Sequence, residues 1–114
     1  MKYRLFGRQS GLRVSELALG TGNFGAKTLG SLVKKIFKAY SEAGGRFIDT
    51  AEGYQNGRSE ELLGEFVGEN RDNFVIASKY SVGQNREEEF SLKGNSRKAM
   101  MRAVEGSLRR LNGE

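Results

Sequence analysis

Three short apolar segments recur along this chain at a nearly constant spacing. They begin at Leu17, Arg46 and Phe74, which lie 29 and 28 residues apart, and each is followed by an amphipathic helical pattern. Strands that alternate with helices at such a period indicate a parallel sheet joined by right-handed crossovers. A Rossmann-like sheet and a (β/α)8 barrel both begin in this way. The sequence therefore predicts an α/β fold built from three βα units.

Local patterns predict the individual elements. A hairpin is expected before the first unit, with strands 3–6 and 12–14 around a glycine-containing turn. We interpret the chain as a single partial domain, with the hairpin in residues 1–16 and the three βα units in residues 17–114. The expected strands of these units are 17–21, 46–50 and 74–79, and the expected helices are 31–43, 60–67 and one that begins after Ser96 and ends at Asn112-Gly113.

Apolar residues at helical spacing predict which helix faces are buried. The packed face of the first helix is expected to contain Leu32, Val33, Ile36, Phe37 and Tyr40. That of the third is expected to contain Met100, Met101, Val104, Leu108 and Leu111. The first strand, LALGT, lacks polar alternation, which predicts burial on both of its faces. A serine at position 59, before two glutamates, predicts the N-cap of the second helix.

The stretch RFIDTAEGYQNGRSEELLG, from Arg46 to Gly64, carries the clearest chemical signal. It predicts a strand, a polar loop and a helix, with Asp49 at the end of the strand and Tyr54 in the loop. A carboxylate and a phenol in these places face one reaction centre in an α/β fold. Lys79 stands at the end of the next expected strand. The alternative interpretation is that all three are ordinary solvated residues at strand ends.

The glycine-rich segment GTGNFG follows the first expected strand. Gly20, Gly22 and Gly25 form a loop in which the backbone can approach a ligand closely. This loop is either the cofactor side of a site or an ordinary turn between a strand and a helix. Local pattern alone does not decide between the two.

Composition excludes several classes of function. The chain has no cysteine and no histidine, so neither a disulfide nor a metal site is expected. The net charge is +5, but the basic residues are spread along the chain, so a nucleic-acid partner is not expected. The N-terminal sequence has no apolar signal-peptide core, and no apolar stretch approaches the roughly 18 residues of a membrane span. We therefore expect a cytoplasmic protein without membrane insertion.

Several motifs in the same order resemble the aldo-keto reductases, in particular the subgroup that includes the voltage-gated potassium channel β subunits. The likeness covers essentially all 114 residues. The opening KYRLFGRQSGLRVSELALGTGNFG is similar to the N-terminal hairpin and first strand of that subgroup. The other matching segments are FIDTAEGYQNGRSEELLG, similar to the first family signature, FVIASKY, similar to the strand that carries the family's lysine, and GNSRKAMMRAVEGSLRRL, similar to the helix after it.

The resemblance implies a (β/α)8 barrel that reduces carbonyl groups with NADPH. In that case Tyr54 would be the general acid, Lys79 would favour its phenolate, and Asp49 would pair with Lys79. Chemistry supports these roles, because a free phenol, with a pKa of about 10, donates poorly at neutral pH, and a neighbouring ammonium assists it. Gly20, Thr21 and Gly22, together with Asp49, would lie beside the nicotinamide ribose of the cofactor; no residue is assigned to a metal.

The resemblance also implies that parts of the family's site are missing. The family's fourth catalytic residue is a histidine after the fourth strand, and most of its NADPH-binding residues lie in the second half of the barrel. A full barrel needs about 250 residues, whereas this chain has 114 and no histidine. We therefore expect the N-terminal part of such a reductase, incomplete and inactive alone.

Two alternatives stay open. One is a working reductase assembled from more than one chain, acting on a carbonyl substrate. The other is a non-catalytic binding, regulatory or oligomerising module derived from the fold. A three-stranded sheet would leave the edges of its outer strands open and expose the face that lines a barrel interior. We accordingly expect self-association or a partner chain at these edges.

Overall fold

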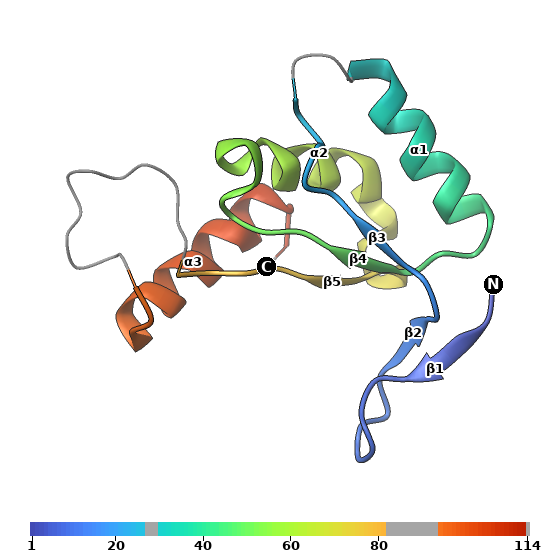
Figure 1. Cartoon of the computed structure of the whole chain (residues 1–114), viewed down its shortest axis with the longest axis horizontal. Coiled ribbons are helices and arrows are strands. Elements are labelled where there is room, and N and C mark those ends of the chain that lie inside the picture. Colours follow the sequence, from blue (N-terminus) through green and yellow to red (C-terminus); the bar gives the residue numbers. More distant parts are fainter. Residues whose placement is uncertain (27–29, 82–93, 114) are drawn as a thin grey trace.

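The computed structural model describes residues 1–26, 30–81 and 94–113, and the expected polar loop at 81–94 lies mostly outside this part of the chain (Figure 1). Its described strands form an antiparallel pair and a three-stranded parallel sheet in the order β3-β4-β5. The strands are β1 (Tyr3–Leu5), β2 (Arg13–Ser15), β3 (Ala18–Gly20), β4 (Phe47–Asp49) and β5 (Val75–Ala77). The helices are α1 (Gly30–Glu42), α2 (Arg58–Val67) and α3 (Arg97–Arg110), with short 3-10 turns η1 (Tyr54–Gly57) and η2 (Gly68–Asn73).

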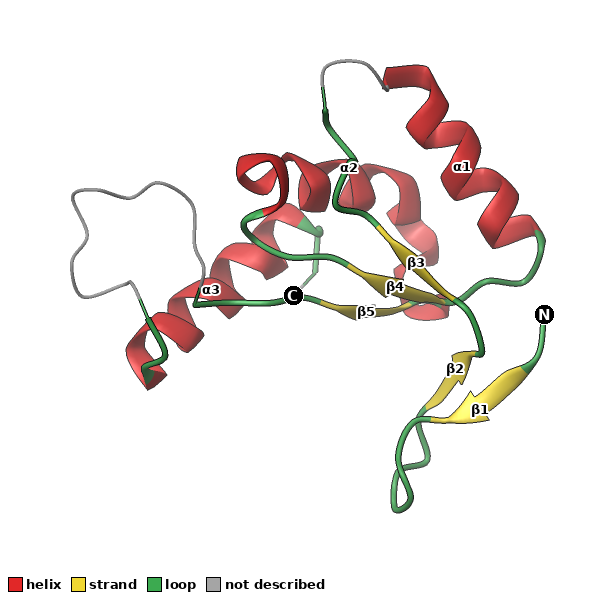
Figure 2. Ribbon diagram, viewed as in Figure 1, coloured by secondary structure: helices red, strands yellow, loops and turns green. Residues whose placement is uncertain are grey.

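This architecture confirms the predicted α/β fold, in which a hairpin precedes three βα units with a parallel sheet (Figure 2). The strands are shorter than predicted, since the ends of the apolar segments run beyond the paired residues. The register sets Gly20 opposite Asp49, and Asp49 opposite Ala77. The carboxyl ends of the three parallel strands are therefore level with one another.

The two faces of the parallel sheet have different surroundings. Ile48, in the middle of β4, is completely buried and belongs to the core formed with the helices. Leu19 and Ile76, its partners in register, also pack against this core. Successive strand residues point to opposite faces, and on the other face Ala18 is exposed.

The core itself joins the helices to the sheet through large apolar side chains. Aromatic rings are prominent in it, with Phe37 packing against both Phe66 and Phe74 at centroid separations of 5.5 Å. The buried members of the cluster are Phe24, Val33, Phe37, Ile48, Leu63, Val67, Phe74 and Leu111.

Burial of the first strand segment on both faces was expected, and this prediction is wrong. Leu17 is 64% exposed and Ala18 is exposed as well, whereas Thr21 is fully buried. The prediction assumed a strand enclosed on both sides. In the described residues the three helices pack on the Ile48 side of the sheet, and the opposite face at this strand is left open.

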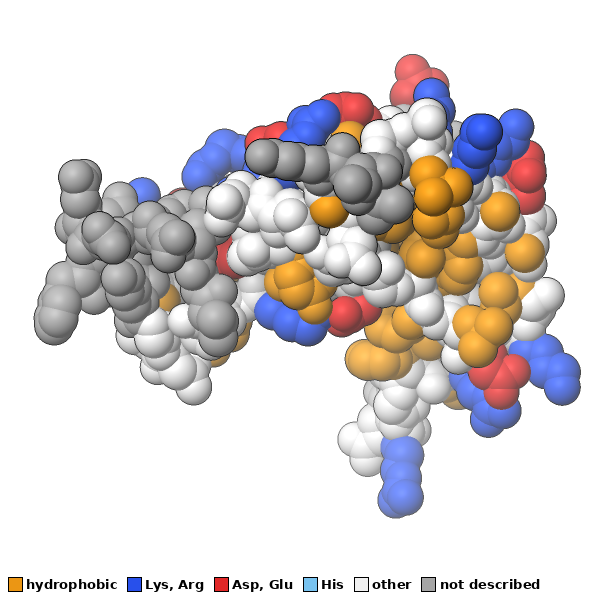
Figure 3. Space-filling model, turned by 45° about the horizontal axis from the view of Figure 1, so that its top comes forward, with side chains coloured by type: hydrophobic (Ala, Val, Ile, Leu, Met, Phe, Trp, Pro, Cys, Tyr) orange, Lys and Arg blue, Asp and Glu red, His pale blue; other side chains and the backbone are white. Residues whose placement is uncertain are grey.

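The predicted helix faces are correct only in part. In α1, Val33 and Phe37 are buried, but Leu32 and Ile36 are exposed. Figure 3 shows uncovered hydrophobic side chains gathered on the side of the molecule that carries α1. Tyr40 packs against the core, as expected of a packing residue.

In α3 the expected apolar face includes residues that lie at the surface. Met101 is 46% exposed, while the buried residues of the helix are Ala99, Ala103, Gly106 and Ser107. Small side chains allow α3 to approach its neighbours closely, so its large apolar residues remain at the margin of the contact. A prediction based only on the large apolar residues of α3 is therefore wrong about which of its residues are buried.

Several local signals act as the sequence predicts. Ser96 caps α3 by accepting a hydrogen bond from the backbone N–H of Ala99 at 3.1 Å. Gly44 follows α1 with a φ of 86°, a left-handed conformation that glycine adopts without steric cost. Asn112 adopts a φ of 52° just beyond α3, so the helix ends where the Asn-Gly pair was expected to end it.

The close contact between α2 and α3 at Gly64 can be tested by substitution. A methyl group added at Gly64 would come within 2.5 Å of the backbone oxygen of Arg110. Helix propensity favours alanine by about 1 kcal/mol, but the clash opposes it. We expect Gly64→Ala to lower the free energy of unfolding by about 1–3 kcal/mol, measured by urea denaturation. Gly30→Ala, where no atom lies within 4 Å of the added carbon, is the control; a stabilising Gly64→Ala would contradict the packing.

Candidate active site

The candidate site lies at the level carboxyl ends of the parallel strands. Asp49 is the last residue of β4, Lys79 lies two residues beyond β5, and Tyr54 begins η1 in the loop between β4 and α2. The structure thus brings together the three side chains that the sequence singled out. In parallel βα folds this end of the sheet is the one where ligands bind.

Lys79 contacts both of the other members of this cluster. Its ammonium donates hydrogen bonds to Asp49 Oδ2 at 2.7 Å, to the backbone carbonyl of Thr50 at 2.9 Å and to the Tyr54 hydroxyl oxygen at 3.3 Å. The ammonium also lies 5.0 Å from the centre of the Tyr54 ring, within the range of a cation–π contact. All three donors of the lysine are therefore engaged, which fixes its position relative to the carboxylate and the phenol.

The pKa of Lys79 is raised above its ordinary value. Partial burial acts in the opposite direction and lowers it, but the hydrogen bond to Asp49, the hydrogen bond to Tyr54 and the attraction of both groups together outweigh burial. The lysine is consequently held in its charged form at neutral pH. The charged ammonium can therefore donate to the Tyr54 hydroxyl oxygen while it is paired with the Asp49 carboxylate.

The loop that presents Tyr54 has an unusual backbone. Gln55 and Asn56 both adopt positive φ values, of 51° and 54°, and Gly57 follows at 86°. Asn and Gly tolerate this left-handed region best, so the Asn-Gly pair forms the expected tight turn. Gln55 donates from its side-chain amide to the backbone oxygen of Gly22 at 3.0 Å. This bond ties the loop carrying Tyr54 to the glycine-rich loop after β3.

Ser59 was predicted to cap α2, and this prediction is wrong. The helix begins at Arg58, and Gly57 occupies the cap position without a side-chain hydrogen bond. The Ser59 hydroxyl instead donates to the backbone oxygen of Thr21 at 3.0 Å and lies 3.2 Å from the hydroxyl of Thr50. The serine and both threonines are completely buried, so a layer of hydroxyl groups joins the first turn of α2 to the ends of β3 and β4.

Glu60 is a further buried group, to which no sequence pattern assigned a role. Its side chain is fully buried and accepts hydrogen bonds from the Ser78 hydroxyl at 2.6 Å and from Arg110 Nε at 2.7 Å. A buried carboxylate needs such partners, since an unpaired charge in the interior is costly. The contact joins α2 to the residue before Lys79 and to the end of α3. A first-turn glutamate gave no signal that distinguished it from a solvated one.

The glycine-rich loop leaves space beside its backbone. A carbon atom added at Gly20 or at Gly22 would meet no other atom within 4 Å, so a ligand can approach there. Thr21 differs, because it is fully buried and donates from its hydroxyl to the backbone oxygen of Asp49 at 3.1 Å. Gly20, Gly22 and Gly25 have GxGxxG spacing, yet residues 22–25 form a turn and not the start of a helix. The spacing therefore does not place an anion at a helix N-terminus.

Two negative observations apply to the described ranges 1–26, 30–81 and 94–113. No three acidic, histidine or cysteine side chains there gather closely enough to hold a metal ion. No helix among these residues has both the length and the apolar character to cross a bilayer.

The chain has parallel βα units, and a carboxylate, a phenol and an ammonium group meet at the carboxyl ends of its strands. It therefore belongs to the class of α/β proteins in which the candidate site lies at the carboxyl ends of parallel strands. Residues 16–114 match the Aldo/keto reductase family. The chain belongs to this family.

The chain is similar to several curated relatives over nearly its whole length. It is 40% identical to norsolorinic acid reductase B of Dothistroma septosporum, over 97% of this chain and 32% of the relative. It is 38% identical to an aryl-alcohol dehydrogenase [NADP(+)] of Phanerodontia chrysosporium, over 96% of this chain and 33% of the relative. The chain therefore spans about a third of the length of these curated relatives.

Solved structures of aldo-keto reductases are also similar to this chain, over part of their own length. An aldo-keto reductase of Bacillus halodurans, solved in its holo form, superposes with a TM-score of 0.82 at 31% identity. The match covers 99% of this chain but 37% of that one. The fold of the described residues is thus that of one portion of a larger aldo-keto reductase.

The raised pKa of Lys79 can be tested by NMR titration of lysine side chains. We expect the pKa of Lys79 to lie above the ordinary lysine pKa of about 10.4, and Asp49→Asn to lower it by removing the partnering carboxylate. The stabilisation from this contact is full below the unfolded pKa of about 10.4 and is lost as the pH rises through the folded value. Asp72→Asn is the control. An unchanged Lys79 titration in Asp49→Asn would contradict the described contact.

The buried pair of Glu60 and Arg110 predicts a large effect on stability. Arg110→Met removes the cation and leaves the Glu60 carboxylate buried without its partner. We expect the free energy of unfolding to fall by about 3 kcal/mol, measured by chemical denaturation at neutral pH. Arg109→Met, at the exposed neighbouring position, is expected to change it by less than about 0.5 kcal/mol. Equal effects of the two substitutions would show that the buried pair has no special role.

Proposed function

We propose that Asp49, Tyr54 and Lys79 form the proton-delivering part of a carbonyl-reducing site that works with NADPH. The observation that carries this proposal is the contact of one ammonium with both the carboxylate and the phenol, at 2.7 Å and 3.3 Å. Membership of the Aldo/keto reductase family supports an oxidoreductase of this kind.

The proposed step reduces a carbonyl group to an alcohol. NADPH, when bound, supplies a hydride to the carbonyl carbon. The hydroxyl of Tyr54 donates its proton to the carbonyl oxygen, and the phenolate that remains is stabilised by the ammonium of Lys79. Asp49 keeps that ammonium charged and in place, in agreement with the raised pKa of Lys79. Hydride and proton together account for both hydrogen atoms added across the C=O bond.

The residues present fit one edge of such a cofactor. The open space beside Gly20 and Gly22 would accommodate the nicotinamide ribose, and Asp49 lies at the same end of the sheet. Thr21 would contribute by holding this loop, because its side chain is turned into the interior. One relative carries NADP(+) in its name, which supports NADPH as the cofactor, and the same name supports an aromatic carbonyl compound as the substrate class.

We propose further that turnover needs βα units beyond these 114 residues. The chain spans about a third of its curated relatives, and it contains no histidine to complete the family's group of four. It would supply the proton-delivering group, while the remaining units would supply most of the cofactor site.

A second candidate is a non-catalytic binding or regulatory module, akin to the potassium channel β subunits that the N-terminal sequence resembles. The exposed apolar side chains of the hairpin favour it, with Leu5 at 56% and Phe6 at 54% exposure. Titration with NADPH of the chain joined to the remaining units of a barrel, followed by cofactor fluorescence, separates the two, because the chain alone holds only part of the proposed cofactor site. Binding supports the reductase interpretation, whereas capture of a partner without any cofactor binding supports the module.

A chimera tests the proposed chemistry directly. These 114 residues would replace the matching portion of the Bacillus halodurans reductase, and NADPH oxidation with an aromatic aldehyde would be followed by absorbance. We expect turnover in the chimera, and a loss of about 10²–10⁴-fold in kcat on Tyr54→Phe, because the proton donor is removed.

Tyr3→Phe is the matched control for this substitution, since its hydroxyl bonds the backbone oxygen of Gly44, before β4 begins. It should leave kcat within about twofold of the chimera. If the chimera is active and Tyr54→Phe leaves its kcat unchanged, Tyr54 is not the proton donor. Turnover by the 114-residue chain alone, sensitive to Tyr54→Phe, would contradict the need for further units.

A further inference from the structure

The turn between Tyr54 and α2 is left-handed over three consecutive residues. Gln55, Asn56 and Gly57 have φ values of 51°, 54° and 86°. Glycine and asparagine enter this region most readily, whereas glutamine has a Cβ and no short polar side chain to bond locally, so its backbone is strained. Such strain persists where the surroundings hold the conformation in place, and it clusters at functional sites. The glutamine at position 55 is therefore explained by its side chain and not by its backbone.

The side chain of Gln55 reaches across to the glycine-rich loop after β3. Its amide donates to the backbone oxygen of Gly22 at 3.0 Å. The two loops also pack together at Gly25, where an added methyl carbon would come within 2.7 Å of Arg58 Cγ and 3.5 Å of Gln55 Cβ. The glycine-rich loop and the turn that begins at Tyr54 therefore meet at two points, of which the hydrogen bond is the directional one.

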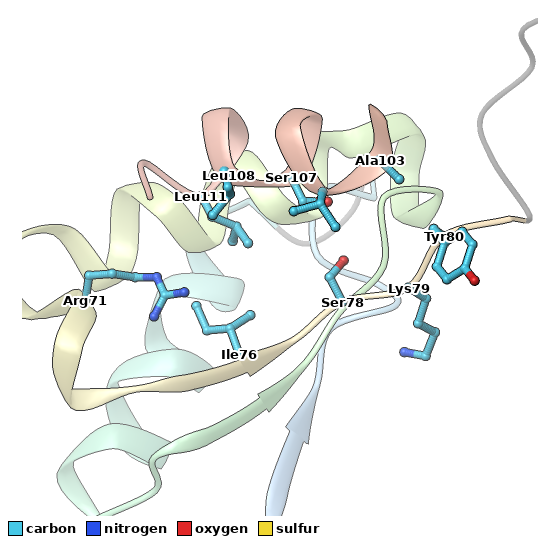
Figure 4. A pocket seen from close by; sticks show the side chains of 10 residues that line it. Arg71, Ile76, Ser78, Lys79, Tyr80, Ala103, Ser107, Leu108 and Leu111 are labelled. Atoms are coloured by element: carbon cyan, nitrogen blue, oxygen red, sulfur yellow. The ribbon is translucent and has the colours of Figure 1, made fainter. Parts of the chain in front are cut away.

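This hydrogen bond joins the two places that the proposed reduction uses. The hydride would come from a nicotinamide beside Gly20 and Gly22, and the proton from the hydroxyl of Tyr54. Both must reach adjacent atoms of one carbonyl group, so a displacement of roughly 1 Å between the two loops can lower the rate by about 10²-fold. Lys79, which points away from α3 at the end of β5 (Figure 4), holds Tyr54 from that side. Gln55 ties the same turn to the β3 side.

We propose that Gln55 is a positioning residue, which fixes the hydroxyl of Tyr54 relative to the glycine-rich loop through its bond to Gly22. The glutamine acts through the backbone of the left-handed turn and not by contact with the reacting atoms. Its effect on turnover rests on the proposed function. The positioning itself is a property of the chain without cofactor, so it can be measured separately from catalysis.

Two glycine substitutions in the turn separate the side chain from the backbone. Gln55→Gly removes the amide and relieves the left-handed strain, whereas Asn56→Gly relieves the same kind of strain at the next residue. No hydrogen bond links the Asn56 side chain to another described residue, so this variant is the matched control. Both variants should fold, with urea midpoints no lower than that of the unaltered chain, because glycine adopts a positive φ without steric cost.

The position of Tyr54 in the 114-residue chain can be followed by nuclear Overhauser cross-peaks between its ring protons and the methylene protons of Lys79. We expect Gln55→Gly to lose most of this intensity, because the turn is then held from the β5 side only, and Asn56→Gly to retain it. Gln55→Glu is a second variant of nearly the same size. Its carboxylate cannot donate to the Gly22 oxygen at neutral pH, so it should resemble Gln55→Gly.

In the chimera described above, the same substitutions should separate kcat from KM. We expect Gln55→Gly to lower kcat by at least about tenfold and to change the KM for the aldehyde by less than about threefold, because the carbonyl is still bound while the proton donor is displaced from it. Asn56→Gly should leave both constants within about twofold. An inactive chimera would count against the proposed reduction, whereas the cross-peaks would still decide the positioning.

Three results would overturn the proposal. One is a Tyr54–Lys79 cross-peak that keeps its intensity in both Gln55→Gly and Gln55→Glu. Another is an equal loss in Gln55→Gly and Asn56→Gly, which would assign the effect to the flexibility of the turn. The third is an active chimera in which Gln55→Gly leaves kcat unchanged, or lowers it only in proportion to a lowered urea midpoint, which would make the glutamine merely structural.

Discussion

The register of the three parallel strands is the constraint on which the candidate site depends. Gly20, Asp49 and Ala77 lie opposite one another, so the loops that leave the sheet begin at one level. A shift of one residue in β4 would turn Asp49 toward the helices and bring Ile48 out of the core, because successive residues face opposite sides. The burial of Ile48 therefore stabilises the arrangement that aims Asp49 at Lys79.

Helix α2 links this register to the polar cluster. Its first turn contacts all three strands at their carboxyl ends, through the Ser59 hydroxyl to Thr21 and Thr50 and through the Glu60 carboxylate to Ser78. Arg110 completes the charge balance of Glu60 from α3. A helix packed only by apolar contacts could slide by a fraction of a turn, whereas these directional bonds fix its position. The position of the partly exposed Lys79 side chain thus depends on buried hydrogen bonds between α2 and the strand ends.

The sequence alone predicted the order of elements, because the 29- and 28-residue spacing and the apolar strands are local signals. The capping of α3 by Ser96 was predictable for the same reason. The role of Ser59 was not, since a serine hydroxyl bonds either its own helix or a neighbouring strand, and only tertiary structure decides which. The exposure of Met101 was missed because α3 packs through small residues. The roles of Asp49, Tyr54 and Lys79 came from family resemblance; the structure adds their proximity.

The central claim is that the strand register and the polar layer at the start of α2 bring the phenol of Tyr54 and the ammonium of Lys79 together within these 114 residues. The most direct test is a nuclear Overhauser measurement on the isolated chain in solution. We expect cross-peaks between the ring protons of Tyr54 and the side-chain methylene protons of Lys79, alongside cross-strand contacts between β4 and β5. Intact β4–β5 contacts without any Tyr54–Lys79 cross-peak would contradict it.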